Sequence, residues 1–484
     1  MRLPIIRLIV PLLFGAFLFA VSLGSSSCKK EQLLVNGGEL KFSTDTLSFD
    51  TVFTSLGSAT VGVKIFNPQN QKITIASVHL ANGASSPFHL NVDGKAGDGT
   101  NIDVAAGDSI YVFATVKVDP TDVNSPFIIQ DRLVANLNGN DFSIPVIAYG
   151  QNAHYIRDSV LETQTWKTDK PYVIFGYAFV DSLQTLTIPA GCRIYMHANA
   201  RLFVGGTLNA TGTKKDSIIF QGDRLDRSYY GFEGYPGEWG GIYFLEYSTD
   251  SYLEHVVLAN CGNSAQNAAP AAVQVSPDAH LSHTIQLTMN KVVIQNSIGY
   301  GLLCFNGSVK ATNCLINSCG ASALALLQGG NYQMDNCTIT TYGSNKINHN
   351  DNPVAAILNY YFYNQTQYYS APLTARFHNC AITGSLDNEV FIDSLKDAAA
   401  TVNLSSCLIK QDPTKIRPWV TQSGNLYALS DGTMDPLYTD ISKFNYRPLS
   451  NSPLLKHGTP PAPIDDLDDV IRSSPTSIGC YDPH

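Results

Sequence analysis

Charge is scarce in this sequence, and positive charge is the scarcest. Lys and Arg number 31 against 40 Asp and Glu, the formal net charge is −9, and charged residues make up 15% of the chain. Duplex nucleic acid and anionic lipid surfaces are bound through clustered positive charge, so neither is an expected partner. The 24 Tyr and 22 Phe indicate instead a neutral, aromatic protein that favours β-structure.

Metal-ligand clusters are also lacking. His280 and His283 are close enough in sequence to share a metal ion, but no thiolate and no cluster of carboxylates accompanies them. Histidines in this setting are more typical of a solvated loop than of a metal site. We therefore predict no metal and no cofactor.

The first 27 residues have the composition of an export signal. Two arginines precede an apolar run over residues 8–23, which is short for a membrane span. Three serines then precede Cys28, which resembles the lipobox of bacterial lipoproteins; the alternative is an ordinary signal peptide with a chance cysteine. The resemblance implies a lipid-modified Cys28, a tether over residues 28–37 and membrane anchoring through the lipid. The expected location is the outer membrane, facing outside, with the periplasmic face as the alternative.

Residues 38–152 read as a series of short alternating strands. Examples are residues 46–49, 60–66 and 109–116, each bounded by Asn-Pro, Asn-Gly or Gly-Asp turn signals. Strands at this spacing are typical of a β-sandwich. The stretch resembles the Ig-like sandwich domains found at the base of bacterial surface proteins.

Residues 153–434 have the pattern of a coiled stack of strands. The runs 186–194, 202–212 and 217–220 are short and apolar and are separated by glycine-containing turns. Three such strands per coil are what a parallel β-helix requires. The stretch resembles right-handed, single-stranded parallel β-helix proteins of the pectate-lyase-like superfamily, so the predicted fold class is all-β, a sandwich followed by a β-helix.

The period of the coils is visible in one column of apolar residues. Ile294, Ile316 and Ile339 are 22 and 23 residues apart, and Leu258 joins them if the segment after it is looped out. Side chains two positions earlier share the same face of the strand and should also point inward. That preceding column consists of Val256, Val292, Cys314, Cys337, Cys380 and Cys407. We expect free thiols in the core, although disulfides between neighbouring coils remain compatible with the spacing.

The last segment, residues 435–484, is expected to be a C-terminal cap. Its Asp-Pro turn at Asp435, the stretch 466–472 and the Ile-Gly-Cys-Tyr end at 478–481 resemble, in this order, the terminal segment of many surface β-helix proteins. The last coil of a solenoid exposes an apolar end that must be covered. We therefore expect this segment to close the stack.

Proteins of this superfamily include polysaccharide lyases and hydrolases, which makes catalysis an alternative to be tested on the residues. Hydrolysis of a glycosidic bond requires two carboxylates that flank it, and a calcium-dependent lyase requires several acidic ligands and a base. The central coils from Val292 to Ile339 carry one acid, Asp335. No catalytic residue is predicted.

Two loops carry the candidate glycan-binding residues. The loop over residues 223–239 mixes carboxylates, arginines and aromatics, and arginine pairs with the carboxylates of acidic sugars; its alternative is a solvated loop that closes on a packed tryptophan. The loop over residues 360–369 is the most aromatic stretch of the chain, and its alternative is a flap packed on the stack. The candidates are Asp223, Arg224, Arg227, Tyr229, Tyr230, Glu238, Trp239, Tyr361, Tyr363 and Tyr368.

These features favour a noncatalytic, surface-exposed lipoprotein that serves as a binding or structural platform for a glycan or a protein. The alternative is a polysaccharide-degrading enzyme, foremost a lyase. The two are distinguished by whether the loops 223–239 and 349–369 converge on one groove that holds clustered carboxylates and a cation.

Overall fold

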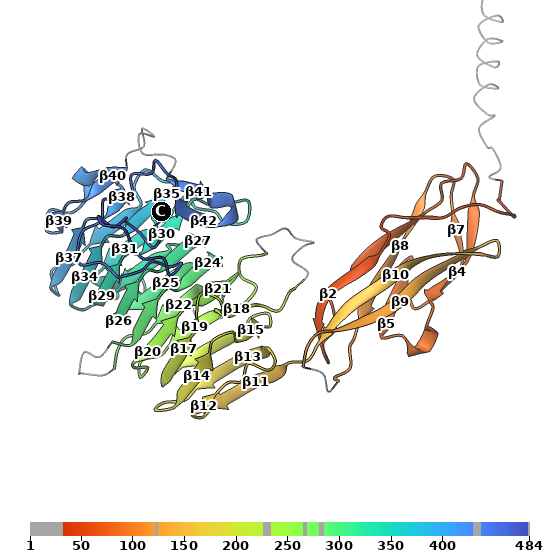
Figure 1. Cartoon of the computed structure of the whole chain (residues 1–484), viewed down its shortest axis with the longest axis horizontal. Helices are drawn as coiled ribbons and strands as arrows, with labels where there is room; N and C mark the ends of the chain where they lie inside the picture. The colour runs from red at the N-terminus through yellow and green to blue at the C-terminus, as the bar shows by residue number, and fades with distance from the viewer. Residues whose placement is uncertain are drawn as a thin grey trace, which may run out of the picture. The chain divides into compact units, whose positions relative to one another are not determined.

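The computed structural model describes residues 32–121, 124–225, 234–264, 269–279, 285–428 and 437–482. Its elements are strands apart from three short 3-10 turns, so the all-β prediction is confirmed. The described chain divides into two compact units at Gln151 and Asn152, with residues 121–125 grouped with the second (Figure 1). Within the described ranges there is no helix long and apolar enough to cross a membrane.

The first unit contains two five-stranded sheets. One sheet consists, in spatial order, of β1 (Lys41–Phe42), β3 (Val61–Phe66), β8 (Ser109–Val116), β5 (Phe88–Val92) and β6 (Lys95–Ala96). The other consists of β2 (Leu47–Phe53), β10 (Asn140–Gln151), β9 (Phe127–Leu137), β4 (Ile73–Leu80) and β7 (Gly99–Val104). Inward-facing residues of both sheets, such as Val112 and Leu133, form one core. The unit is therefore a two-layered β-structure.

The second unit is a stack of coils whose strands pair in parallel and lie on three faces. Face A consists of β16 (Arg201–Val204), β19 (Gly241–Phe244), β22 (Ala271–Val275), β25 (Tyr300–Phe305), β28 (Leu324–Leu327), β31 (Ala355–Leu358) and β36 (Val390–Asp393). Face B consists of β15 (Arg193–Met196), β18 (Ile218–Gly222), β21 (Val256–Ala259), β24 (Val293–Ser297), β27 (Leu315–Cys319), β30 (Thr338–Thr341), β35 (Ala381–Gly384), β38 (Leu408–Lys410) and β40 (Leu426–Ala428). These two faces, with β11 (His154–Leu161) and β13 (Tyr172–Val180), form one eighteen-stranded sheet.

Face C is the remaining ten-stranded sheet. It consists of β12 (Gln164–Thr165), β14 (Thr185–Pro189), β17 (Thr207–Thr211), β20 (Ser251–Glu254), β23 (Leu287–Asn290), β26 (Ser308–Thr312), β29 (Gly330–Asp335), β34 (Leu373–His378), β37 (Ala400–Ser405) and β39 (Thr421–Ser423). Long sheets of parallel strands in successive coils are consistent with the predicted β-helix.

The predicted register of the stack is confirmed. Leu258 pairs with Ile294, Ile294 with Ile316, and Ile316 with Ile339. These residues are buried, as are all members of the valine and cysteine column before them. Each coil is too small to bury its own inner face, so these columns stabilise the fold by stacking on their neighbours.

The nine described cysteines are free and buried, which confirms the prediction of thiols in the core. Burial raises the pKa of the Cys314, Cys337 and Cys380 thiols well above the usual value. A thiol that stays protonated is a weak nucleophile and a poor metal ligand. These side chains therefore act as small apolar residues.

The three corners of the stack differ sharply in length. The C–B corner is a tight turn with one residue in the left-handed region in successive coils, including Asn313, Asn336 and Asn379 at φ of 55°, 50° and 52°. Asparagine tolerates this conformation better than most residues. The B–A corner carries long loops, among them 223–240 and 342–354, and the A–C corner carries the insertion 359–372. Candidate binding residues from different loops therefore lie at different corners.

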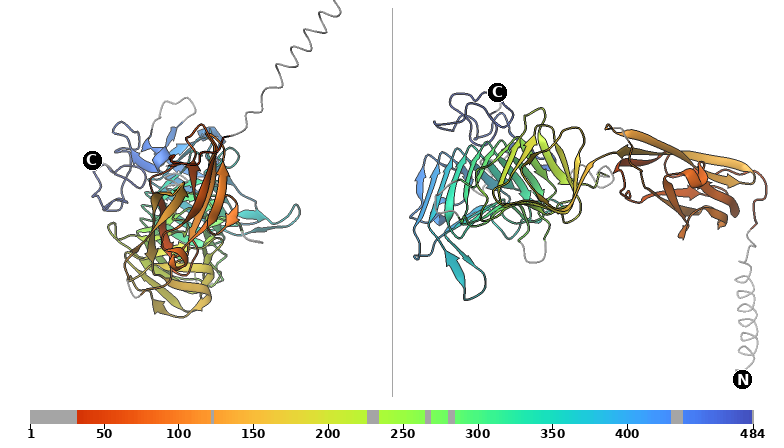
Figure 2. Two further views of the ribbon diagram at one scale, coloured as in Figure 1. Left: turned by 90° about the vertical axis from the view of Figure 1, so that its right-hand side faces the viewer. Right: turned by 90° about the horizontal axis from the view of Figure 1, so that it is seen from below.

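The expectation that residues 435–484 close the end of the stack is wrong. The described part of this segment, 437–482, lies along the flank of the stack (Figure 2), and we call it the strap. It contains β41 (Tyr438–Asp440) and β42 (Asn445–Pro448). Its apolar residues pack on outward-facing residues of face B, among them Leu315, Ala381 and Leu408.

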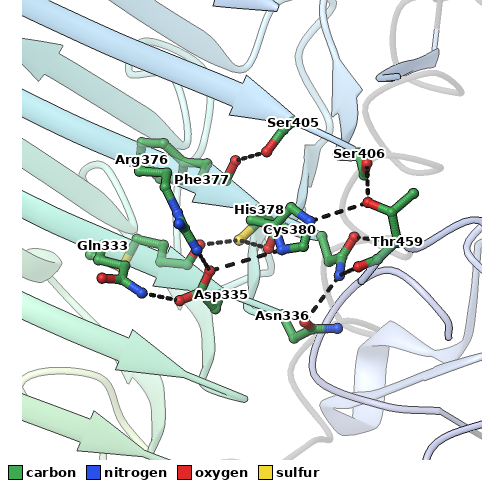
Figure 3. A network of polar contacts seen from close by, with 12 residues as sticks. Gln333, Asp335, Asn336, Arg376, Phe377, His378, Cys380, Ser405, Ser406 and Thr459 are labelled. Atoms are coloured by element: carbon green, nitrogen blue, oxygen red, sulfur yellow. Dashed lines mark hydrogen bonds and ion pairs between the residues drawn. The ribbon is translucent and has the colours of Figure 1, made fainter. Parts of the chain in front are cut away.

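The asparagines of the C–B corner hold the strap. Asn313 Nδ2 donates to Asp465 O at 3.0 Å and Asn379 Nδ2 donates to Thr459 O at 2.9 Å. Next to it, Ser406 Oγ and Thr459 Oγ1 form a hydrogen bond of 2.7 Å (Figure 3). The left-handed turns point these side chains away from the core, and the strap satisfies them. A lateral strap rather than an end cap is the result.

Candidate functional site

The aromatic insertion at the A–C corner is a β-hairpin. Its strands β32 (Tyr360–Phe362) and β33 (Tyr368–Ser370) pair antiparallel, with Tyr361 opposite Tyr369 and Phe362 opposite Tyr368. It stands away from the stack (Figure 2). We call residues 359–372 the tyrosine hairpin.

Aromatic rings occupy both sides of the tyrosine hairpin. On one side, Tyr363 makes edge contacts with Tyr361 and Tyr369, at centroid distances of 5.0 and 4.7 Å. On the other side, Phe362 and Tyr368 lie 5.4 Å apart. Phe362 is 49% exposed and Tyr363 is 52% exposed. Exposed rings with amides at the tip offer flat apolar surfaces beside hydrogen-bonding groups.

Three phenols fix the tyrosine hairpin to the body of the stack. Tyr360 donates to Asp393 Oδ2 at 3.0 Å and Tyr363 donates to Gln328 Oε1 at 3.0 Å. Tyr368 donates to Asp397. Burial and Asp393 raise the pKa of Tyr360 to about 12, and the hydrogen bond to Asp397 raises the pKa of Tyr368, so both phenols stay protonated donors at neutral pH. The rings are thus held in place before any ligand arrives.

The tyrosine hairpin packs against a buried apolar cluster on the outward side of face A. Leu303 and Ala325 form a cluster separate from the inner core, and Phe305 joins this cluster to Tyr361 at a ring distance of 5.0 Å. Across the seven strands of face A, the charged side chains are Arg201 and Asp393. The candidate surface is therefore aromatic and nearly uncharged.

The two charged residues of face A are engaged within the protein. Asp393 pairs with Arg417 Nη2 at 2.9 Å besides accepting from Tyr360. Arg201 is buried, and its guanidinium donates to the backbone oxygens of Asn199 and Asn263. Neither arrangement places two carboxylates on either side of a ligand, as hydrolysis would require.

The predicted residue Asp223 lies at the B–A corner and binds a residue that the sequence did not single out. Its carboxylate accepts a hydrogen bond of 2.6 Å from His197 Nδ1, and its side chain is 12% exposed. The hydrogen bond to Asp223 raises the pKa of His197. The main role of Asp223 is therefore to orient the half-exposed imidazole of His197.

Replacing Asp223 with Asn is expected to lower the pKa of His197 towards its ordinary value, because the amide removes the negative charge that favours the imidazolium. The stabilisation from a raised histidine pKa is complete below the unfolded pKa and is lost as the pH rises through the folded pKa. The parent should therefore exceed Asp223→Asn in stability at about pH 5.5 but not at about pH 8.5. NMR titration of the labelled histidines and urea unfolding at both pH values measure this. An unchanged His197 titration would contradict the pairing.

The other predicted residues of the 223–239 loop have different surroundings. Glu238 accepts from the Tyr235 N–H at 3.0 Å and shapes the loop. Trp239 is fully buried and donates from Nε1 to Ala259 O at 2.9 Å, so it offers no stacking face at the surface and its prediction as a binding residue is wrong. Arg224 is exposed. Arg227, Tyr229, Tyr230, Cys28, His280 and His283 lie outside the described residues.

A second loop meets this one at the B–A corner. Lys346 Nζ donates to Gly234 O at 2.8 Å and lies 4.8 Å from the centre of the Tyr235 ring. Residues 342–350 and Ser385 line a polar pocket of about 580 Å³. Residues 234–235 and the 342–350 loop therefore come together, whereas the tyrosine hairpin lies at the other border of face A.

A buried histidine and glutamate anchor the 342–354 loop. His349 Nε2 lies 3.0 Å from Glu389 Oε2, and both side chains are shielded from solvent. Glu389 also accepts from the backbone N–H groups of Val354 and Leu386 at 3.0 and 2.7 Å. These three donors satisfy the buried carboxyl group, as a polar group in the core requires. Among the described ranges, no group of three or more candidate metal ligands comes together.

Comparisons with known proteins find distant likenesses. No protein-family model and no curated protein matches the chain. The catalytic domain of a GH87 α-1,3-glucanase in complex with tetrasaccharides is 9% identical, covers 79% of this chain and 92% of its own length, and has a TM-score of 0.16. A PapD-like domain of human CEP192 covers 26% of this chain and 94% of its own length at 9% identity and a TM-score of 0.17. For a family 123 glycoside hydrolase from Clostridium perfringens, the values are 6% identity and a TM-score of 0.17, and the match spans 23% of this chain and a quarter of that protein's length.

Proposed function

We propose that this protein is a noncatalytic carbohydrate-binding lipoprotein of the cell envelope. In this proposal the first unit is an Ig-like stalk and the second is a right-handed β-helix of the pectate-lyase-like type. The glycan lies on the outward side of face A against the tyrosine hairpin. Lipid at Cys28 anchors the chain in the outer membrane, facing outside.

The single observation that carries the proposal is the exposed, buttressed set of rings in the tyrosine hairpin. Aromatic faces with phenol and amide groups nearby stack on sugar rings while they bond the hydroxyls. Three phenol hydrogen bonds reduce the entropy that ordering these rings would cost on binding. The absence of paired carboxylates from the strands of face A favours binding over cleavage.

A glycan array followed by a cleavage assay tests the proposal. The parent chain is expected to bind an extended oligosaccharide without producing new reducing ends or the unsaturated products of elimination. Turnover of a bound glycan that Asp223→Ala or Glu238→Ala abolishes would establish an enzyme instead. No binding to any glycan would leave a protein partner or a structural role.

Replacing Cys28 with Ala is expected to release the protein from membranes or to leave its signal segment uncleaved. Two or three acyl chains anchor a protein stably, because each buried methylene contributes about 0.8 kcal/mol. Membrane fractionation and the intact mass of the exported chain measure the effect. A variant that fractionates and migrates like the parent would contradict lipidation.

A further inference from the structure

The border of face A that carries the tyrosine hairpin is acidic. The described residues of the A–C corner include four carboxylates and one base: Glu246, Asp250, Asp278 and Asp397 against Lys396. The tyrosine hairpin itself carries no charged side chain over residues 359–372. An acidic glycan that stacks on these rings would meet repulsion, whereas a positively charged one would be attracted.

One of these carboxylates accepts a hydrogen bond from the tyrosine hairpin. Asp397 is exposed and is held in place by the Tyr368 phenol. The Tyr368 ring is 41% exposed and lies 5.4 Å from Phe362, at an interplanar angle of 54°. A carboxylate bonded to one of two adjacent, accessible aromatic rings can bind an ammonium group through charge pairing and through the negative faces of the rings.

We infer that Phe362, Tyr368 and Asp397 form a subsite for the ammonium group of an amino sugar. The inference rests on the proposed carbohydrate binding and deepens it by naming the ligand class, a glycan with free amines. The ammonium sits over the rings and pairs with Asp397, while neighbouring sugar rings stack on the tyrosines. Lys396 directly precedes Asp397 in the sequence and is exposed, and its positive charge opposes the ligand.

The test compares three oligosaccharides of equal length on the full mature chain: a glucosamine oligomer, its N-acetylated counterpart and a galacturonate oligomer. The first two oligomers share linkage and ring stereochemistry. They differ in the nitrogen substituent, which is a charged ammonium group in the first and a neutral acetamide in the second. We expect the free-amine oligomer to bind about tenfold more tightly than the acetylated one, and the galacturonate oligomer to bind most weakly. Isothermal titration at low and high salt measures the ratio, which should fall as salt screens the charge.

Asp397→Asn is expected to bring this ratio close to one while binding of the acetylated oligomer persists. Lys396→Ala should raise the ratio. Glu254→Gln is the matched control, because this acid lies on face C, where it accepts from Asn290 at 2.7 Å; it should leave the ratio unchanged. Unfolding midpoints confirm that each variant is folded.

Equal binding of the free-amine and acetylated oligomers would overturn the inference and leave the proposed carbohydrate binding intact. A preference that survives Asp397→Asn would also overturn it. If no oligosaccharide binds, the proposed function fails as well. Asp397-dependent binding of oligolysine without any glycan binding would identify a basic peptide as the partner and overturn the amino-sugar assignment.

Discussion

Replacing Arg472 with Met lowers the stability of the stack, with an expected loss of about 3 kcal/mol. Its side chain is half-buried and ties the strap to the coils. Nη2 donates to Asn313 Oδ1 at 2.6 Å and to Gly479 O at 3.1 Å, and Nε donates to Asp465 O at 3.1 Å. Methionine fills much of the volume but leaves these acceptors unpaired. The shift of the urea midpoint of the full chain measures the loss.

Arg447→Met is the matched control, since it removes the same side chain from the same strap. Arg447 is half-exposed and pairs with Asp468 at the surface. Exposed ion pairs contribute about 1 kcal/mol or less. Equal losses for both variants would contradict the view that Arg472 has a special role in holding the strap.

The dependence on Arg472 follows from what the strap covers. Face B turns apolar residues such as Leu315 and Leu408 outward, and these are buried by the strap rather than by the coils. The left-handed turns also present asparagine amides that donate to backbone oxygens of the strap. The strap is therefore part of the folded stack, and a chain that lacks it would expose an apolar sheet face prone to association.

The columns of the stack could be predicted from sequence because they depend on local pattern alone. Isoleucines and cysteines at a fixed offset in successive coils must share one inward face, whatever the loops do. The position of the strap could not be predicted, because its hydrogen bonds join residues such as Asn313 and Asp465 that are far apart in the chain. The asparagine before Cys314, Cys337 and Cys380 was the available signal, since its turn conformation directs the side chain outward.

The candidate site was predicted in part. The run of aromatics identified the tyrosine hairpin, because no core strand needs rings at successive positions on both faces. Trp239 was misjudged since its charged neighbours suggested an exposed loop, whereas the indole packs near Phe220 and donates to a backbone oxygen. His197 and Asp397 carried no sequence signal, because each gains its role from a partner in another coil.

Replacing Tyr361, Tyr363 and Tyr368 together with Ala is expected to weaken glycan binding by about 100-fold, since each stacked ring contributes about 1 kcal/mol beyond its buried area. Asp223→Asn and Glu238→Gln should change the affinity by less than about threefold, because both carboxylates bond within the protein at the other corner. Titration with the oligosaccharide found on the array measures all three.

The double variant Tyr363→Phe and Tyr368→Phe separates stacking from hairpin geometry. It keeps both rings and removes the phenol contacts to Gln328 and Asp397. If stacking area carries the affinity, this variant should bind far better than the alanine triple variant and somewhat worse than the parent, because its rings lose preorganisation. If the alanine triple variant still binds the glycan, the binding site is not the tyrosine hairpin. If Asp223→Asn or Glu238→Gln abolishes binding, the glycan site lies at the B–A corner. The polar pocket beside Lys346 would then be the site to test.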